Sequence, residues 1–210
     1  MSPVKASHAT GPNGAPGFPL WVHGNGNQAQ ANVLGALEKH KAEGLRDVVV
    51  HFTMPTMEQL QSIARQRIGV TFLVNDFYYY YQPLCEQILG SAADTASLYP
   101  AQWAEQSKLH YSLHSDASVT PPSAMFGVWV ASTRNYQKGY GLPKLSAACD
   151  TAAVKGSQKI SRMQAMRAYT SEAAWLYGRE NSIGSLQNGY AGDLVVLSAD
   201  PLVCVSMNPG

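Results

Sequence analysis

Charged residues are scarce in this chain of 210 residues, at 14% against about 25% in a typical soluble domain. Fifteen lysines and arginines against fourteen acidic residues leave a net charge of +1, and there is no basic run. A nucleic acid or an anionic membrane held by electrostatic attraction is therefore not expected as a partner. No apolar run approaches the roughly 18 residues that a membrane-spanning helix needs, so no membrane span is expected.

Cysteine is also scarce. The three cysteines, Cys85, Cys149 and Cys204, are far apart and odd in number. A disulfide framework is therefore not expected, and without a CxxC pair no zinc or redox motif of that kind is present. Cys85 is interpreted as a small buried apolar residue. The first eighteen residues lack the apolar segment of a signal peptide, so we expect a flexible lead-in at 1–18 and a cytoplasmic protein.

Short apolar runs alternate with helical stretches along the rest of the chain. The apolar runs at 19–22, 48–50, 70–74 and 109–113 predict strands, and the stretches at 28–41, 56–68, 124–136 and 161–177 predict helices. Capping-box patterns begin two of these helices, at Thr56 with Gln59 and at Ser161 with Gln164. The regular alternation predicts parallel strands joined by crossovers. An open doubly wound sheet and half of a (β/α)8 barrel both fit this pattern.

Three metal-ligand types follow the predicted strands. His23 ends the first, His51 the second, and Asp116 lies just after the fourth. Because functional side chains gather at the carboxyl ends of parallel strands, the two imidazoles and the carboxylate could form a catalytic metal site with a position open for water. The alternative is that each is a hydrogen-bonded structural residue. His114 could help bind substrate, although a strand-end polar residue is the simpler interpretation, and the tyrosines at 78–81 are expected to pack in the core or at its rim.

Five segments, taken in order, resemble the C-terminal half of metal-dependent amidohydrolases of amidohydrolase family 3. The similar motifs are Val22-His23-Gly24-Asn25-Gly26-Asn27-Gln28-Ala29, Val50-His51 with the helix after it, Phe72-Leu73-Val74-Asn75, Ser112 to Pro121, and Ile183 to Leu197. The resemblance extends from about Leu20 to Val205. It implies an α/β fold, a partial (β/α)8 TIM barrel (strands 5–8) over 19–178, with a remnant of the small β domain as a β-hairpin tail over 179–210.

The resemblance also implies chemistry. It suggests hydrolysis of a small-molecule amide, or of another non-peptide C–N bond, with zinc or a similar divalent metal. His23 and His51 are implied metal ligands. Asp116 is implied as the catalytic carboxylate that binds metal or water and moves the proton.

The chain also departs from the family pattern. No HxH motif occurs, Asn27 replaces the usual aspartate, and Asp76 stands where a related branch often has histidine. We therefore expect a fragment with an incomplete metal site, which forms a homo-oligomer or associates with a missing N-terminal half. The alternative is a catalytically inactive remnant that acts only as a weak metal-binding or interaction module.

Overall fold

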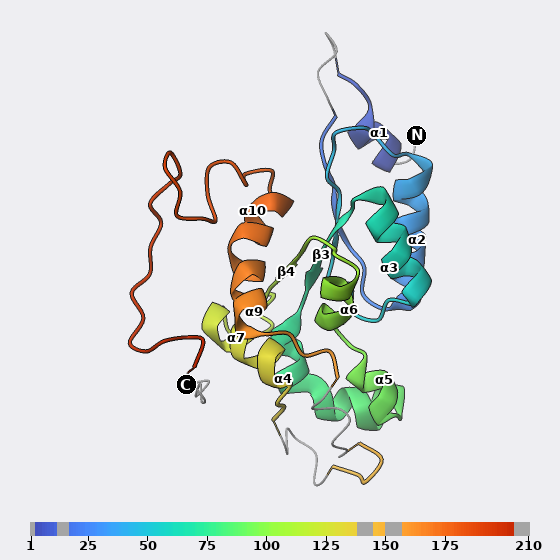
Figure 1. Ribbon diagram of the computed structural model, residues 1–210. Helices are drawn as coiled ribbons and strands as arrows, with labels where there is room; N and C mark the ends of the chain where they lie inside the picture. The colour runs from blue at the N-terminus through green and yellow to red at the C-terminus, as the bar shows by residue number, and fades with distance from the viewer. Residues whose placement is uncertain (1–2, 12–16, 138–144, 150–156, 204–210) are drawn as a thin grey trace.

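A computed structural model describes residues 3–11, 17–137, 145–149 and 157–203, which contain a four-stranded parallel sheet (Figure 1). The strands β1 (Trp21–His23), β2 (Val48–Val50), β3 (Gly69–Phe72) and β4 (Tyr111–Leu113) lie side by side in chain order. Val22 pairs with Val49, which pairs with Val70, which pairs with Tyr111. Since every pair is parallel, the carboxyl ends of all four strands lie on the same side of the sheet, called here its carboxyl edge. The predicted α/β fold with parallel strands is confirmed.

One helix precedes β1, and helices follow each of the four strands. They are α1 (Pro3–His8), α2 (Asn27–Lys39), α3 (Met57–Gln66), α4 (Val74–Pro83), the π-helix η2 (Leu84–Leu89), α5 (Ala92–Ala96), α6 (Ala101–Gln106), α7 (Ala124–Thr133), α9 (Arg162–Tyr169) and α10 (Ser171–Leu176). Figure 1 shows α2 and α3 together on one flank of the sheet, and α7, α9 and α10 on the other. No helix in these described ranges is both long and apolar enough to cross a membrane.

Local sequence accounts for much of this framework. Val48 and Val49 are fully buried, as expected of β-branched residues in an inner strand. The predicted capping box of α3 is present, because the Thr56 hydroxyl accepts from the Gln59 amide and the Gln59 side chain accepts from the Thr56 amide. The buried face of α3 carries Leu60 and Ile63, both with no exposed surface. Caps and apolar spacing thus position the elements that surround β2.

The third strand is shorter than predicted. It ends at Phe72, and α4 begins at Val74, so the tyrosines at 78–81 lie on a helix. Tyr81 is fully buried and its ring stacks on Tyr136 at 4.1 Å, which confirms a core role for that tyrosine. The early turn into α4 places Asp76 beside the carboxyl edge of the sheet.

The single helix predicted for 161–177 is interrupted. Thr170 separates α9 from α10 with φ −124° and ψ −94°. Its hydroxyl donates to the Met166 carbonyl at 2.8 Å, and such back-bonding bends helices. The predicted stop is confirmed, since Gly178 follows with φ +67°.

The amino-terminal segment differs from the expected flexible lead-in. Its described part contains α1, and His8 is buried at the end of that helix. The His8 ring lies 3.0 Å from the Asp47 carboxylate and 2.7 Å from the His40 carbonyl. Asp47 also accepts from the Leu20 amide at 2.9 Å, so α1 is fastened to the residue that leads into β1.

A disulfide joins Cys85 to Cys149, contrary to the sequence expectation. The two cysteines are 64 residues apart in sequence, and their Cα atoms lie 6.1 Å apart. Cys85 is fully buried, as expected, but as one half of this bond. An odd number of cysteines means that not all of them can form disulfides, but it still allows one disulfide. The third cysteine, Cys204, lies outside the described residues. Since disulfides are rare in the cytosol, this bond weighs against the cytoplasmic expectation.

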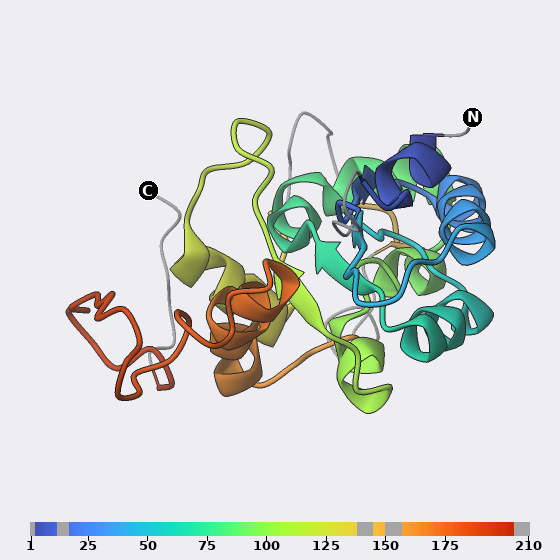
Figure 2. The same ribbon diagram turned by 90° about the horizontal axis from the view of Figure 1, so that it is seen from above.

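The expected hairpin is absent from the described part of the tail. Residues 179–203 form turns and irregular chain with no strand, and Figures 1 and 2 show them extending away from the sheet. Leu194, Val195 and Val196 are 74%, 74% and 97% exposed. The pattern at 193–197 is that of a strand, but a strand needs a neighbour to pair its backbone groups, and the described chain provides none there.

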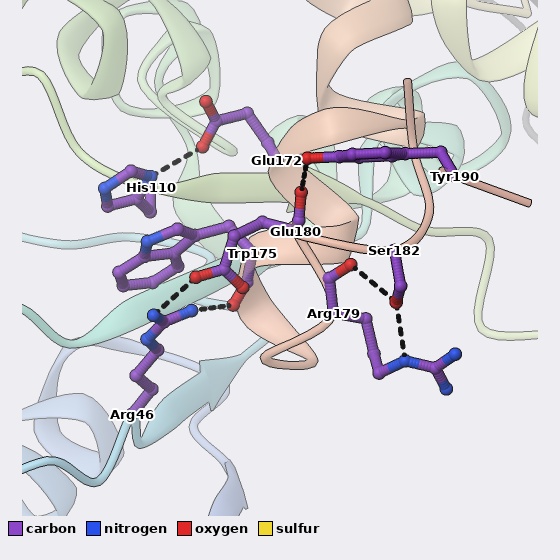
Figure 3. Close-up of polar contacts among 8 residues, drawn as sticks. All are labelled: Arg46, His110, Glu172, Trp175, Arg179, Glu180, Ser182 and Tyr190. Atoms are coloured by element: carbon purple, nitrogen blue, oxygen red, sulfur yellow. Dashed lines mark hydrogen bonds and ion pairs between the residues drawn. The ribbon is translucent and has the colours of Figure 1, made fainter. Parts of the chain in front are cut away.

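A polar cluster fastens α10 to the amino end of the sheet (Figure 3). The Arg46 guanidinium donates to the Trp175 carbonyl at 2.9 Å and to Glu180 at 2.5 Å. His110 stacks on the Trp175 ring at 3.6 Å and bonds Glu172 at 2.8 Å. Trp175 therefore contacts both the residue near the start of β2 and the residue that leads into β4.

We expect Glu180→Gln to reduce the loss of stability in acid. The hydrogen bond from Arg46 lowers the pKa of Glu180 from its ordinary 4.5, so the pair stabilises the fold above that pH and the contribution is lost as the pH falls through the lowered pKa. With side chains 34% and 27% exposed, solvent screening limits the effect to about 1 kcal/mol at most. Urea unfolding at pH 7 and pH 3 measures it, with Glu38→Gln as the control. An acid loss as large in Glu180→Gln as in the wild type would contradict the prediction.

Candidate functional site

Two predicted site residues, His23 and His51, lie together at the carboxyl edge of the sheet. His23 ends β1 and His51 follows β2, its neighbour in the sheet. Their ring centroids are 4.4 Å apart in an edge-to-face arrangement. His51 is only 5% exposed, whereas His23 is exposed. The pair therefore has one ring inside the fold and one open to solvent.

His114 and Asp116 reach the same place from β4. The His114 amide donates to the Phe72 carbonyl at 2.9 Å, which continues the pairing of β3 with β4 beyond the last strand residue. Its ring centroid lies 4.9 Å from that of His51, and the Asp116 Oδ2 atom lies 4.0 Å from His51 Nε2. Since β3 separates β2 from β4, their backbones are about 10 Å apart, so these side chains must converge over β3.

Left-handed backbone conformations occur at these positions. His51 has φ +73° and Asp116 has φ +50°, although neither is glycine and neither ends a helix. Such residues cost of order 1–3 kcal/mol each and cluster at functional sites. Here the turned backbone aims both side chains across the end of the sheet.

Burial keeps the inner imidazoles neutral. It is the main cause that lowers the pKa of His51, helped by His23 and opposed by Asp116. Burial also lowers the pKa of His114 to about 4, helped by His51 and opposed by Asp116. Both rings are therefore uncharged near neutral pH, which is the form whose nitrogen lone pair can bind a metal.

Two buried nitrogens in this group lack partners. Neither His51 Nδ1 nor His114 Nε2 has a hydrogen-bond partner among the described residues. Unpartnered imidazole nitrogens beside a carboxylate are a donor set that suits zinc and similar divalent ions. The described ranges nevertheless contain no three His, Cys, Asp or Glu side chains close enough together to hold a metal ion. The chemistry of these donor atoms therefore suits a metal ion, but the described side chains do not lie close enough together to form a complete set of metal ligands.

Sequence reasoning gave too little weight to two residues here. His114 was interpreted as a strand-end polar residue, yet its ring packs against His51 in the group. Its spacing of two from Asp116 was the available indication. Asp76 received no role from its residue type, and no sequence pattern linked it to its hydrogen-bond partner Tyr99.

Comparisons with known proteins find relatives of this chain by sequence and by fold. The model of a family described as "Amidohydrolase family" matches residues 13–208. The putative amidohydrolase YtcJ of Bacillus subtilis is 26% identical over 190 residues, and the N-substituted formamide deformylase of Arthrobacter pascens is 25% identical over 194. The alignments cover 88% and 90% of this chain but 33% of each relative. The chain thus spans about a third of the length of these relatives.

A solved structure shares the fold. The crystal structure of an uncharacterized metal-dependent hydrolase from Pyrococcus horikoshii OT3 superposes with a TM-score of 0.71 at 17% identity. The superposition covers 89% of this chain and 35% of that one. Because the family model spans nearly the whole sequence, with two curated relatives and a matching fold beside it, this chain belongs to the amidohydrolase family.

Proposed function

We propose that this chain forms strands 5–8 of a (β/α)8 barrel and contributes part of the active site of a metal-dependent hydrolase of amide or other non-peptide C–N bonds. The observation that carries the proposal is the convergence of His23, His51, His114 and Asp116 at the carboxyl edge of the sheet. In (β/α)8 enzymes the catalytic groups lie at this edge. The family and its metal-dependent relatives support the same class of reaction.

The roles follow from exposure and charge. His23 and His51 would hold the metal, with zinc the ion that best suits two neutral imidazoles and a carboxylate. A divalent metal, when bound, lowers the pKa of water and polarises a carbonyl oxygen. The Asp116 side chain is 43% exposed and lies beside His51, so it can accept a proton from water and return it to the leaving nitrogen. The His114 nitrogen without a partner can donate to or accept from a bound substrate.

The alternative function is a catalytically inactive, weakly metal-binding module. It is favoured by one observation: no closed ligand cluster is present in the described ranges. The chain spans about a third of the length of its curated relatives, so this chain alone would lack any ligand that lies outside the aligned part. We therefore expect hydrolysis by this chain alone to be undetectable or very slow.

The substrate class and partners remain predictions. One curated relative is named for deformylation of N-substituted formamides, which is consistent with a small-molecule amide substrate here. β1 and β4 are the outer strands of the described sheet, so each has an edge open to pairing. A homo-oligomer, or association with a missing N-terminal half, would cover these edges.

Zinc titration tests the proposal directly. Calorimetry at pH 7 is expected to show about one zinc ion per chain, bound more weakly than at a complete site with supporting hydrogen bonds. The double variant His23→Ala, His51→Ala is expected to lose this binding, because it removes both imidazoles that face each other at 4.4 Å. His40→Ala is the control, since it removes a histidine far from the group.

Thermal unfolding of each variant shows that the fold survives. Unchanged zinc stoichiometry in the folded double variant would refute the metal site. Robust hydrolysis by the wild-type chain that disappears in Asp116→Asn would instead show that the expectation of an incomplete site is wrong.

A further inference from the structure

A second carboxylate, Asp76, lies at the carboxyl edge of the sheet beside the histidine group. It is in the first turn of α4, four residues after Phe72, the last residue of β3. Burial and, to a lesser extent, repulsion from Asp116 raise the pKa of Asp76. One oxygen, Oδ2, accepts a hydrogen bond from the Tyr99 hydroxyl. The other, Oδ1, has no hydrogen-bond partner in the part of the chain described here, and Asp76 forms no ion pair there.

The Tyr99 hydroxyl is held in place by a rigid support. Tyr99 is only 2% exposed, its backbone is left-handed with φ +52°, and its amide donates to the Thr53 carbonyl at 2.9 Å. Thr53 in turn donates from its hydroxyl to Asn25 at 2.6 Å. Tyr99 therefore connects Asp76 to the loops that follow β1 and β2, which are the loops beside His23 and His51.

A buried arginine fixes the segment before Tyr99. The Arg134 guanidinium donates to the carbonyls of Ala96 and Leu98 at 3.2 and 2.9 Å. It also lies 3.5 Å from the centroid of the Phe77 ring, next to Asp76 in sequence. A fully buried cation is costly to maintain, yet here it holds a tyrosine whose hydroxyl orients one carboxylate.

A second observation concerns two buried histidine nitrogens at the same end of the sheet. The His51 residue is 5% exposed, and neither its Nδ1 atom nor the Nε2 atom of His114 has a hydrogen-bond partner in the described part of the chain. Three groups with unused hydrogen-bonding capacity thus surround one end of the sheet: two neutral imidazoles and the Asp76 carboxylate. No ion pair of Asp76 occurs among the described residues, so only the Tyr99 hydroxyl and the first turn of α4 stabilise its charge. A ligand that brings a positive charge or N–H donors would compensate it.

We propose that Asp76, positioned by Tyr99, is a specificity-determining residue that binds an ammonium or other N–H-donating group of the substrate next to the C–N bond to be cleaved. The proposal rests on the proposed function and names its substrate class: amides that carry a cationic amine. Asp76 is a binding residue, and Tyr99 and Arg134 are positioning residues that act through it.

Two small amides test this specificity. Glycinamide carries an ammonium group next to its amide, and acetamide is the matched compound without it. NMR titrations of the full chain, with and without zinc, are expected to show glycinamide binding about tenfold more tightly than acetamide, the difference that one charge-assisted hydrogen bond provides. Asp76→Asn is expected to bring the two affinities within about twofold of each other. Tyr99→Phe keeps the carboxylate but loses its orientation, so it should retain an intermediate preference.

Glu38→Gln, which removes an exposed carboxylate of α2, is the control and should keep the full preference. Equal affinities in the wild type, no detectable binding of either amide, or an undiminished preference in folded Asp76→Asn would overturn the proposal. Zinc affinity is measured on the same samples and is expected to change by less than about threefold in Asp76→Asn, because Asp76 is not one of the proposed ligands. In the wild type, equal affinities for the two amides with zinc binding intact would refute the role of Asp76, whereas absent zinc binding with the amide preference intact would refute the metal-dependent function.

Discussion

Replacement of Cys85 and Cys149 by alanine is expected to lower the free energy of unfolding by about 4 kcal/mol. Their disulfide closes a loop across a sequence separation of 64 residues, which contains β4, α7 and the residues His114 and Asp116. Without the bond the unfolded chain regains the entropy of that loop. Alanine is the right replacement, because serine would place hydroxyl groups where the cysteines are 0% and 2% exposed.

Chemical denaturation of the oxidised and reduced wild type, and of the double alanine variant, measures this effect. Reduction of the wild type should reproduce the loss seen in the variant, and reduction of the variant should change nothing further. Cys204→Ala is the control, since it keeps the disulfide. A denaturation midpoint of the wild type that is insensitive to reductant would contradict the prediction.

Arg134→Ala is expected to destabilise the chain by about 3–5 kcal/mol. Arg134 is 1% exposed, and burial lowers the pKa of its guanidinium to about 9, so the group is still charged at neutral pH. Truncation leaves the buried carbonyls of Ala96 and Leu98 without a donor and removes the contact with the Phe77 ring. The cavity left by the side chain adds to the loss.

The comparison that isolates the cause is Arg134→Lys. An ammonium keeps the charge but cannot reproduce a planar group that bonds two carbonyls and stacks on a ring, so we expect a partial loss. Arg167→Ala, on the exposed face of α9, is the control and should stay within about 0.5 kcal/mol of the wild type. Urea unfolding measures all three. A cost for Arg134→Ala below that of Arg134→Lys would show that the buried charge destabilises the fold.

Several features follow from sequence because they are decided over a few residues. The capping box of α3 needs only Thr56 and Gln59, and the stop after α10 needs only the positive φ of Gly178. The three valines of β2 identify a buried strand by their branching alone. Alternation of such elements predicted parallel pairing, which in turn placed His23, His51 and Asp116 at one edge.

Tertiary structure decided what depends on distant segments. The convergence of His114 with His51 requires β2 and β4 to be brought together across β3, and the Cys85–Cys149 bond requires two residues 64 apart in sequence to meet. Asp76 acquires its candidate role only because Arg134 fixes the segment that carries Tyr99. The strand-like tail shows the opposite case: residues 193–197 have the composition of a strand, but strand pairing is a property of two segments, and the described chain offers no second one. Sequence determined the local elements and their order, and the packing of segments far apart in the chain determined which side chains meet.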